Sequence, residues 1–318
     1  MTNDNPLPKR PLISVIAVSF RSAQTIESTL ESIANQTYQR LELIICDDDS
    51  DDETVAIAKR WLQENHRRFE RVSVAAQPKN VGIVKNYDTG LHWAQGDWIK
   101  PIACDDMLYK HALETYMKVA ASTSMQWAFS QCSLFSETQG EHIELGELVP
   151  ERTACLLQRG DHAALQERLL RSNILPAPSA FFHRDLLIAS GGLDKRFRNL
   201  DDWPLWVRSI DAGYFPYWID EPLIKYRVGA QGVTNQNKLQ AVKPGLFKDE
   251  RTLFRHYQSA RLPALESWDI RVRHWQQWLA YRCFANSAKA LKLLSPMLLL
   301  SPLCVFRKMH IATESSTQ

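Results

Sequence analysis

The sequence predicts an α/β protein with a mostly parallel central sheet, followed by a helical C-terminal extension. Three observations support this class. Between residues 12 and 103, four short apolar runs alternate with segments of helical periodicity, a pattern typical of a parallel sheet with helices on its faces. Acidic clusters directly follow two of these runs. Beyond about residue 245 the helical periodicity dominates.

The first two strands are predicted from apolar, β-branched runs. LISVIAV at 12–18 is short and apolar, as buried strands are, and the segment after it repeats Ile26, Leu30 and Ile33 at helical spacing. The second run, RLELIIC at 40–46, ends on the acidic stretch DDDSDDET. A helix follows that stretch.

The third and fourth strands complete the alternation. RVSVAAQ at 71–77 is followed by a helical segment in which Ile83, Tyr87 and Leu91 share one side, and DWIKPIA at 97–103 is the fourth strand. Ligands of parallel α/β sheets bind at the carboxyl ends of the strands. Both acidic clusters stand at such ends, so a ligand site is expected there.

The second part of the chain is mixed. Past residue 125, short extended segments alternate with helices, and a long helix is predicted over 264–294. In that helix Trp268, Val272 and Trp275 form one apolar stripe.

Composition and charge limit the possible functions. The chain has 318 residues, 45% hydrophobic and 23% charged, with a net charge of +2. Residues 241–310 contain 12 Lys and Arg against 4 Asp and Glu, which leaves the rest of the chain at −6. The basic region predicts contact with an anionic surface, or else a solvated arginine-rich helical surface. The acidic body argues against nucleic-acid binding.

Cysteine usage and hydropathy favour a cytoplasmic protein. The six cysteines are scattered, and no CxxC pair suggests a zinc site. The N-terminus has no apolar signal core. No run reaches the roughly 20 apolar residues of a membrane span.

The adjacent carboxylates Asp105 and Asp106 are the most informative local feature. They follow the fourth strand directly. Like charges in a partly buried site repel and raise a pKa, and burying them is costly unless something compensates. A bound cation is the usual compensator, whereas a helix N-cap is the alternative interpretation. Their position at a strand end favours the ligand site.

Between residues 11 and 235 the chain contains four motifs, in this order: PLISVIAVSFRSAQTIESTLESIANQTY…LELIICDDDSDDET, NVGIVKNYDTGLHWAQGDWIKPIACDDML, GGLDKRFRNLDDWPLWVR and EPLIKYRVGAQGVT. Together they resemble the motifs of family 2 glycosyltransferases, in the same order. The resemblance implies a GT-A (Rossmann-like) fold, a nucleotide-sugar donor and an inverting transfer to a hydroxyl. It suggests bacterial surface-polysaccharide biosynthesis, such as lipopolysaccharide O-antigen or capsule. UDP is the default nucleotide, with GDP, dTDP and CDP open.

The same resemblance implies a division of the chain. Residues 1–10 would be a flexible N-terminus, and 11–240 the GT-A domain, with a nucleotide-binding half at 11–110 and an acceptor half at 111–240. Residues 241–318 would be a basic helical extension.

Roles on the donor side follow by motif. Asp106 matches the metal-binding acid, and Asp105 the neighbour that faces the ribose or the donor sugar. A hard divalent cation, Mn²⁺ or Mg²⁺, would neutralise the departing diphosphate, and phosphate oxygens would complete its shell.

The nucleoside pocket would be lined by residues at the ends of the first two strands. The residues that match the family's base- and ribose-reading positions are Ser19, Phe20, Asp47 and Asp48. A solvated acidic turn is the alternative for this loop.

A further basic–amide pair lies near the nucleotide in the family. Lys85 and Asn86 match this pair, with Lys85 otherwise an exposed helix lysine. Arg227 is expected to reach the diphosphate through the GAQGVT loop, or else to be structural.

A second acid pair, Asp201 and Asp202, is implied to be catalytic. Asp202 matches the family's base, and Asp201 stands where Glu is common. A carboxylate beside another has a raised proton affinity, which suits a general base. The alternative is an N-cap for the following helix, with Pro204 in its first turn.

Two departures from the family pattern remove no implied ligand. Asp49 replaces a common Gly, so the loop is expected to be tighter or differently hydrated. Cys104 precedes the acid pair and is expected to be buried and inert.

The apolar, Pro-interrupted stretch 290–310 has flanking basic residues and suits an interfacial anchor on the inner face of the plasma membrane. The alternative is packing onto the catalytic domain.

Two other function classes remain. A nucleotidyltransferase-like enzyme would need a Gly-rich phosphate loop, and no GxGxxG or Walker sequence occurs. An inactive nucleotide-sugar-binding relative would not need the acids, and all of them are present.

Overall fold

The computed structural model describes residues 10–138, 141–229, 240 and 242–301. The chain divides into two compact units. Unit 1 comprises Met1–Lys195 and Asp201–Val228, and unit 2 comprises Arg196–Leu200 and Gly229–Gln318. Each unit is described separately below.

The first half of unit 1 is a parallel sheet, as predicted. Its strand order is β3 (Arg71–Ala76), β2 (Leu41–Asp47), β1 (Ile13–Ser19) and β4 (Trp98–Ala103). In register, Ser19 lies beside Asp47, and Val18 lies beside Ala103. The carboxyl ends of β2, β1 and β4 therefore meet at one edge of the sheet.

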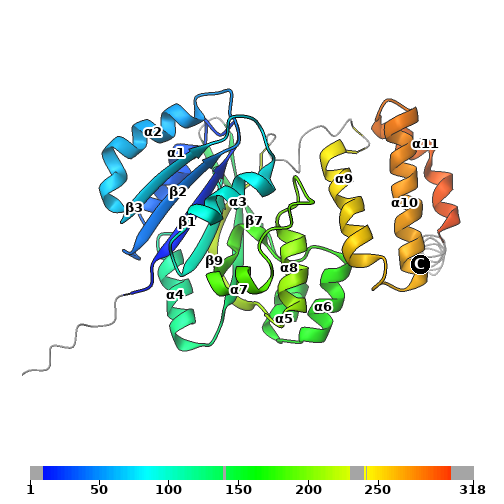
Figure 1. Ribbon diagram of the computed structural model, residues 1–318. Coiled ribbons are helices and arrows are strands. Elements are labelled where there is room, and N and C mark those ends of the chain that lie inside the picture. Colours follow the sequence, from blue (N-terminus) through cyan, green and yellow to red (C-terminus); the bar gives the residue numbers. More distant parts are fainter. Residues whose placement is uncertain (1–9, 139–140, 230–239, 241, 302–318) are drawn as a thin grey trace, which may run out of the picture. The chain divides into compact units, whose positions relative to one another are not determined.

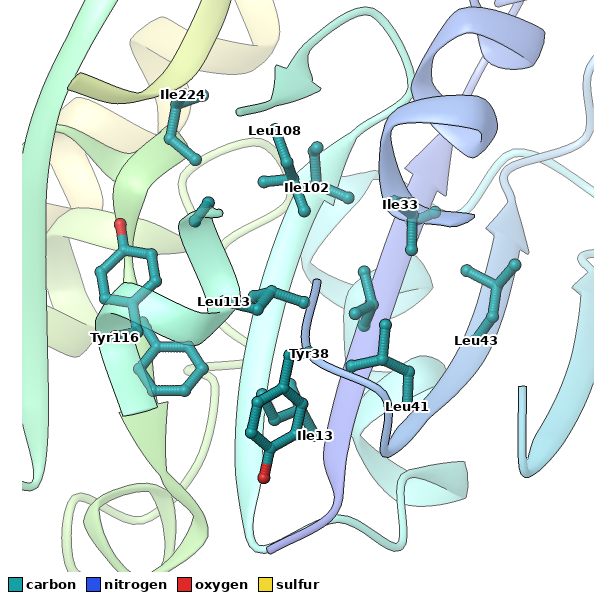
Figure 2. Close-up of a cluster of buried hydrophobic side chains, with 14 of the residues drawn as sticks. Ile13, Ile33, Tyr38, Leu41, Leu43, Ile102, Leu108, Leu113, Tyr116 and Ile224 are labelled. Carbon is teal, nitrogen blue, oxygen red and sulfur yellow. The ribbon is translucent and has the colours of Figure 1, made fainter. Parts of the chain in front are cut away.

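Helices cover both faces of this half-sheet, because side chains alternate along each strand. Alternate residues of β1, such as Ile13 and Val15, join one core with α1 (Ile26–Ala34) and α2 (Thr54–Asn65). Figure 2 shows Ile13, Leu41 and Leu43 of neighbouring strands in this core with Ile33 of α1.

The opposite face of the half-sheet packs against α3 (Ile83–Trp93), which crosses the strands in Figure 1. Gly90 permits this close approach. A Cβ built on Gly90 would lie 2.4 Å from the Ile16 Cγ2 and 2.9 Å from the Cys46 Sγ.

The second half of the sheet is mixed rather than parallel. β8 (Phe181–His183) pairs antiparallel with β4 and with β6 (Trp127–Thr138), and β6 pairs parallel with β9 (Tyr217–Arg227). β5 (Met107–Leu108) pairs antiparallel with β9, and β7 (Glu141–Glu147) with β6. The helices of this half are α4 (Ala112–Ser122), α5 (Glu151–Gln158), α6 (His162–Arg171), α7 (Arg184–Ala189) and α8 (Asp202–Asp211), with short 3-10 turns at His66–Arg68 and Ala177–Ser179.

Unit 2 is helical, as predicted. It contains α9 (Pro244–Leu253), a π-helical turn at Phe254–Gln258, α10 (Ala264–Cys283), α11 (Ala288–Leu293) and a 3-10 segment at Ser295–Leu300. No helix among the described residues is both long enough and apolar enough to cross a bilayer.

The predicted extent of the long helix, 264–294, was wrong. The helix is interrupted after Cys283, where Ala285 and Asn286 take positive φ angles of 50° and 54° that end helical geometry. The residues of the predicted apolar stripe all lie on α10, and the stripe is only partly buried. Val272 is buried, but Trp268 and Trp275 are half exposed.

Candidate active site

The acid pair Asp105–Asp106 lies in the short turn between β4 and β5. Asp106 is buried, and its Oδ1 accepts a hydrogen bond from the backbone N–H of Arg227 at 3.0 Å. Its carbonyl accepts the Thr29 hydroxyl of α1 at 2.7 Å. Helix α1 and strand β9 thus hold this turn from two sides.

Burial sets the electrostatics of this pair. It raises the pKa of Asp106 well above its ordinary value, and the charge of Asp105 raises it further. Burial also raises the pKa of Asp105, while the charge of Arg227 acts in the opposite direction. Such a pair gains from a cation, because the cation replaces the solvation that both carboxylates have lost.

Arg227 ends β9 and braces the acid-bearing turn. Its Nε donates to the Asp105 carbonyl at 2.8 Å, and its guanidinium pairs with Glu137 and lies 4.6 Å from the Phe135 ring centre. The side chain is 11% exposed. The loop through which Arg227 was predicted to reach the diphosphate lies, from residue 230 onward, outside the described residues.

The predicted nucleoside residues meet at the ends of β1 and β2. The Ser19 hydroxyl donates to Asp47 Oδ2 at 2.9 Å, and the Ser50 backbone N–H donates to Asp47 Oδ1 at 2.9 Å. Asp47 and the next residue, Asp48, are both buried. The Asp48 carboxylate accepts the backbone N–H groups of Val81 and Gly82 at 2.6 and 2.9 Å. Asp48 therefore fixes the loop that leads into α3.

The rest of this loop is more open. Phe20 is 46% exposed, and the Arg21 guanidinium lies 5.1 Å from its ring centre. Asp49 takes a φ of 63°, in the left-handed region that glycine favours. This conformation gives a physical reason for the common glycine there, and the chain keeps the turn with Asp in its place.

Lys85 and Asn86 face different ways on α3. Lys85 is exposed. Asn86 is buried, and its Nδ2 donates to the Cys46 carbonyl of β2 at 2.8 Å, which ties α3 to the sheet. Asn86 therefore has a structural bond, whereas Lys85 is accessible.

The second acid pair, Asp201–Asp202, begins α8. Burial raises the pKa of Asp201 to about 7, and the charge of Asp202 adds to this shift. Burial also raises the pKa of Asp202, while hydrogen bonds from the Trp203 backbone N–H and the Asn173 side chain, both 2.6 Å, oppose the rise. The charge of Asp201 also contributes to a raised pKa of the buried Tyr87 hydroxyl, which lies on α3.

Asp201 takes the N-cap position of α8, where its side chain makes no capping hydrogen bond within the described residues. Asp202 is the first residue of the helix, and its side chain accepts the backbone N–H of Trp203 and the Asn173 amide. Pro204 lies in the first turn of α8, as expected. The two bonds from Trp203 and Asn173 fix the orientation of the Asp202 carboxylate.

Two residues near these acids were not identified from the sequence. Lys100 on β4 is fully buried, and its ammonium donates to the carbonyls of Pro101, Pro178 and Ala180. Burial lowers its pKa to about 7, while the charges of Cys132 and Asp106 act in the opposite direction. The sequence did contain a signal for Lys100, because a lysine within a largely apolar predicted strand must be buried or specially paired. Asn173 had no local signal, since it reaches Asp202 only through the fold.

Cys104 is buried as predicted, and burial followed by the charge of Asp105 raises the pKa of its thiol. A thiol so protonated is a poor nucleophile.

The residues present fit a divalent cation held by few protein ligands. Among the described residues there is no group of three or more His, Cys, Asp or Glu side chains that could hold a metal ion. Asp105 and Asp106 supply two neighbouring carboxylates, so phosphate oxygens of a donor would have to complete the shell.

Comparisons with known proteins agree with this geometry. Residues 14–143 match the family model described as glycosyl transferase family 2. A Bacillus subtilis protein named as a teichuronic acid biosynthesis glycosyltransferase, TuaG, is 26% identical over 239 residues, which cover 75% of this chain and 87% of TuaG. The B. subtilis glycosyltransferase EpsE is 26% identical over 68% of this chain and 73% of its own.

Two solved structures share the fold. S. aureus TarS 1–349 in complex with UDP-GlcNAc has a TM-score of 0.59 at 14% identity, covering 85% of this chain and 73% of that one. The Pyrobaculum calidifontis mannosyltransferase PcManGT, in complex with GDP-Man and Mn²⁺, has a TM-score of 0.51 at 17% identity, covering 93% and 87%.

Proposed function

We propose that this chain, whose residues 14–143 match the glycosyl transferase family 2 model and whose fold resembles that of TarS, is a glycosyltransferase of that family. It would transfer a sugar from a nucleotide-diphosphate sugar, with UDP as the default nucleotide, to a hydroxyl of a saccharide or lipid-linked saccharide. The transfer inverts the configuration at the anomeric carbon. The observation that carries this proposal is the presence of two acid pairs, Asp105–Asp106 and Asp201–Asp202, in which Asp106 is buried and the other three are partly buried. All four carboxyls have raised pKa values.

The donor half is assigned to residues 11–110. Asp106 would hold a divalent cation, Mn²⁺ or Mg²⁺, and Asp105 would face the ribose or the sugar. When bound, the cation supplies the positive charge that neutralises the diphosphate leaving group. One side of the proposed donor site is formed by hydrogen-bonded residues at the carboxyl ends of β1 and β2, namely Ser19, Asp47 and Asp48.

The nucleoside would lie against Ser19, Asp47 and Asp48. Asp48 keeps the loop before α3 in place through two backbone N–H groups. The exposed Phe20 ring is available for stacking on a base. Lys85 is exposed and could contact the base edge or the diphosphate. Asn86 ties α3 to β2 through its bond to the Cys46 carbonyl.

The acceptor half is assigned to residues 111–240, with Asp202 as the general base. Asp202 would take the proton of the acceptor hydroxyl as the oxygen attacks the anomeric carbon from the face opposite the diphosphate. The Asn173 amide orients the carboxylate at 2.6 Å. Asp201, with a pKa of about 7, holds a proton more readily than a solvated aspartate, so Asp202 would be the ionised partner.

The basic C-terminal extension is proposed to touch an anionic membrane surface from the cytoplasmic side. Trp268, Trp275 and Trp278 on α10 are 51%, 50% and 40% exposed, and Arg271 lies between them at helical spacing. Trp is enriched at membrane–water interfaces, and basic residues are attracted to anionic lipids. Of the predicted anchor 290–310, residues 302–310 lie outside the described residues.

Unit 2 also has a concave site beside these tryptophans. A pocket of about 420 Å³ is lined by Arg251, Arg255, Arg271, Trp275 and Trp278, among other residues. Three guanidiniums beside two indoles match the charge and polarity of a phospholipid headgroup layer.

The donor assignment is tested by calorimetric titration of UDP, GDP, dTDP and CDP, each with and without Mn²⁺. We expect one nucleotide to bind in a manganese-dependent manner, and Asp106→Ala to abolish this dependence. Asp97→Ala changes an exposed aspartate just before β4 and is the matched control. Equal binding of the preferred nucleotide to wild type and Asp106→Ala would overturn the metal assignment.

A further inference from the structure

A pocket of about 620 Å³ lies between α5 and α6 in unit 1. Three arginines line it: Arg152 and Arg159 on or next to α5, and Arg168 on α6. The apolar part of the lining includes Leu156 and Ile174, and Glu151 also contributes. The three guanidiniums outweigh the single carboxylate, so the pocket is net positive.

The helices explain why the arginines converge. Arg152, Cys155 and Arg159 recur at three- and four-residue spacing and therefore share one face. On α6, Ala164 and Arg168 are four residues apart and face the same pocket. Within residues 10–138, 141–229 and 242–301, none of the three arginines has an acidic partner within ion-pair distance.

Two hydrogen bonds join the chain neighbours of pocket-lining residues to the start of α8, where the proposed base lies. Ile174 lines the pocket, and the preceding residue, Asn173, donates its amide to Asp202 at 2.6 Å. Leu169 follows Arg168, and its carbonyl accepts the Trp203 indole N–H at 2.7 Å. The segment from Arg168 to Ile174, which ends α6 and continues past it, therefore both lines the arginine pocket and is hydrogen-bonded to the start of α8.

We propose that this pocket binds an anionic group of the acceptor, either a phosphate or a uronic-acid carboxylate, while the acceptor hydroxyl lies at Asp202. Arginine recognises both oxyanions through paired N–H donors. The apolar side chains of Leu156 and Ile174 would contact the adjoining carbon skeleton. This inference rests on the proposed glycosyl transfer and names the chemical class of its acceptor.

Cys155 provides a readout that does not depend on activity, because it is half-buried and lines the pocket. Full-length protein would be alkylated with iodoacetamide, and modification of the Cys155 peptide would be followed by mass spectrometry. The probes are sn-glycerol 3-phosphate, methyl β-D-glucuronide and the neutral methyl β-D-glucoside. At ten times its dissociation constant, a bound probe should slow Cys155 alkylation about tenfold.

The charged probes are expected to protect Cys155, and the neutral glycoside is not. Protection by the phosphate alone would assign a phosphate-bearing acceptor, and protection by the glucuronide alone an acidic sugar. Each variant is scored by the ratio of rates with and without probe, because removing arginines also changes intrinsic thiol reactivity.

Matched variants make the assignment specific. The triple variant Arg152→Gln, Arg159→Gln, Arg168→Gln should lose the protection. A second triple variant, Lys59→Gln, Arg60→Gln, Arg67→Gln, removes the same charge from exposed positions of α2 and the turn after it, and should keep the protection. If the first variant is still protected, or if the glycoside protects as well as the charged probes, the proposal is wrong.

Asp202→Asn separates this inference from the proposed function. It should leave Cys155 protection intact while slowing glycosyl transfer. If the wild-type protein is protected at Cys155 but shows no transfer activity, the anion site is supported and the proposed glycosyl transfer is wrong.

Discussion

Asp202 is a carboxylate whose partly buried environment disfavours the ionised form and whose two oxygens are held by the Asn173 amide and the Trp203 backbone N–H. Burial raises its pKa, and the Asn173 side chain holds one of its oxygens. A base of this kind accepts a proton more readily than a solvated aspartate. At the scale of single residues, the proposed chemistry depends on this carboxylate.

We expect Asp202→Asn to lower turnover by more than about 10²-fold, because an amide cannot accept the acceptor proton. Donor affinity should be unchanged. The measurement compares turnover, with the nucleotide identified by titration, and nucleotide binding by calorimetry. Asp97→Asn serves as the control for loss of an exposed carboxylate, and an unchanged rate in Asp202→Asn would contradict the assignment.

Asp201 gives a prediction for stability against pH. Its folded pKa of about 7 exceeds the ordinary value of 3.8, so between these values the folded state holds a proton that the unfolded state has released. Its contribution to the free energy of unfolding is therefore greatest below about pH 4 and is lost as pH rises to about 7.

Asp201→Asn removes this titration. Denaturant unfolding at pH 5 and pH 8 should show a smaller loss of stability with rising pH in this variant than in wild type. Asp97→Asn should follow the wild type. The same pH dependence in Asp201→Asn and wild type would show that Asp201 titrates normally.

At the scale of elements, α3 links the proposed donor site to the core. It begins at a loop held by Asp48, is tied to β2 by Asn86, and crosses the sheet at Gly90. The absence of a side chain at position 90 sets the distance between the helix and the strands.

Gly90→Ala should therefore destabilise the protein. The added methyl would lie 2.4 Å from Ile16 and 2.9 Å from Cys46, and such overpacking costs about 1–3 kcal/mol. Shifting α3 would also move the loop beneath the nucleotide, so nucleotide affinity should fall as well. Urea unfolding and calorimetry measure both effects.

Lys85→Ala, an exposed position of the same helix, is the control for stability. A Gly90→Ala variant as stable as wild type would contradict the close packing of α3 on the sheet.

At the scale of the whole molecule, the uneven distribution of charge along the chain bears on the proposed membrane contact. The acidic body and the basic extension differ in sign, and the extension presents Trp and Arg together on α10. This arrangement favours attachment to an anionic bilayer, where a lipid-linked acceptor would be found.

We expect the full-length protein to co-sediment with vesicles of phosphatidylglycerol and phosphatidylcholine, but weakly with pure phosphatidylcholine. Binding should weaken as salt rises, because charges are screened. Trp275→Ala with Trp278→Ala should reduce binding, while Trp93→Ala, a partly exposed tryptophan of unit 1, should not. Equal binding by all three proteins would contradict the proposed membrane face.

The sequence predicted the parallel half-sheet well, because β1, β2 and β4 are predominantly apolar runs, and this hydropathy can be recognised from local residues alone. The mixed half was predicted only coarsely. Strands β6, β8 and β9 are far apart in the chain, and their pairing depends on long-range contacts that no local pattern records. The break after Cys283 was missed for a similar reason, since no Gly or Pro marks it.

By itself the sequence determined the α/β class, the family resemblance and the candidate acids, because the acids follow directly on apolar strands. The tertiary structure alone decided which groups surround them. It brought Arg227 to the turn of Asp105 and Asp106, and Asn173 to Asp202. It also gathered three arginines from two helices around one pocket. Side chains distant in sequence meet only when the chain packs, and burial then sets their pKa values.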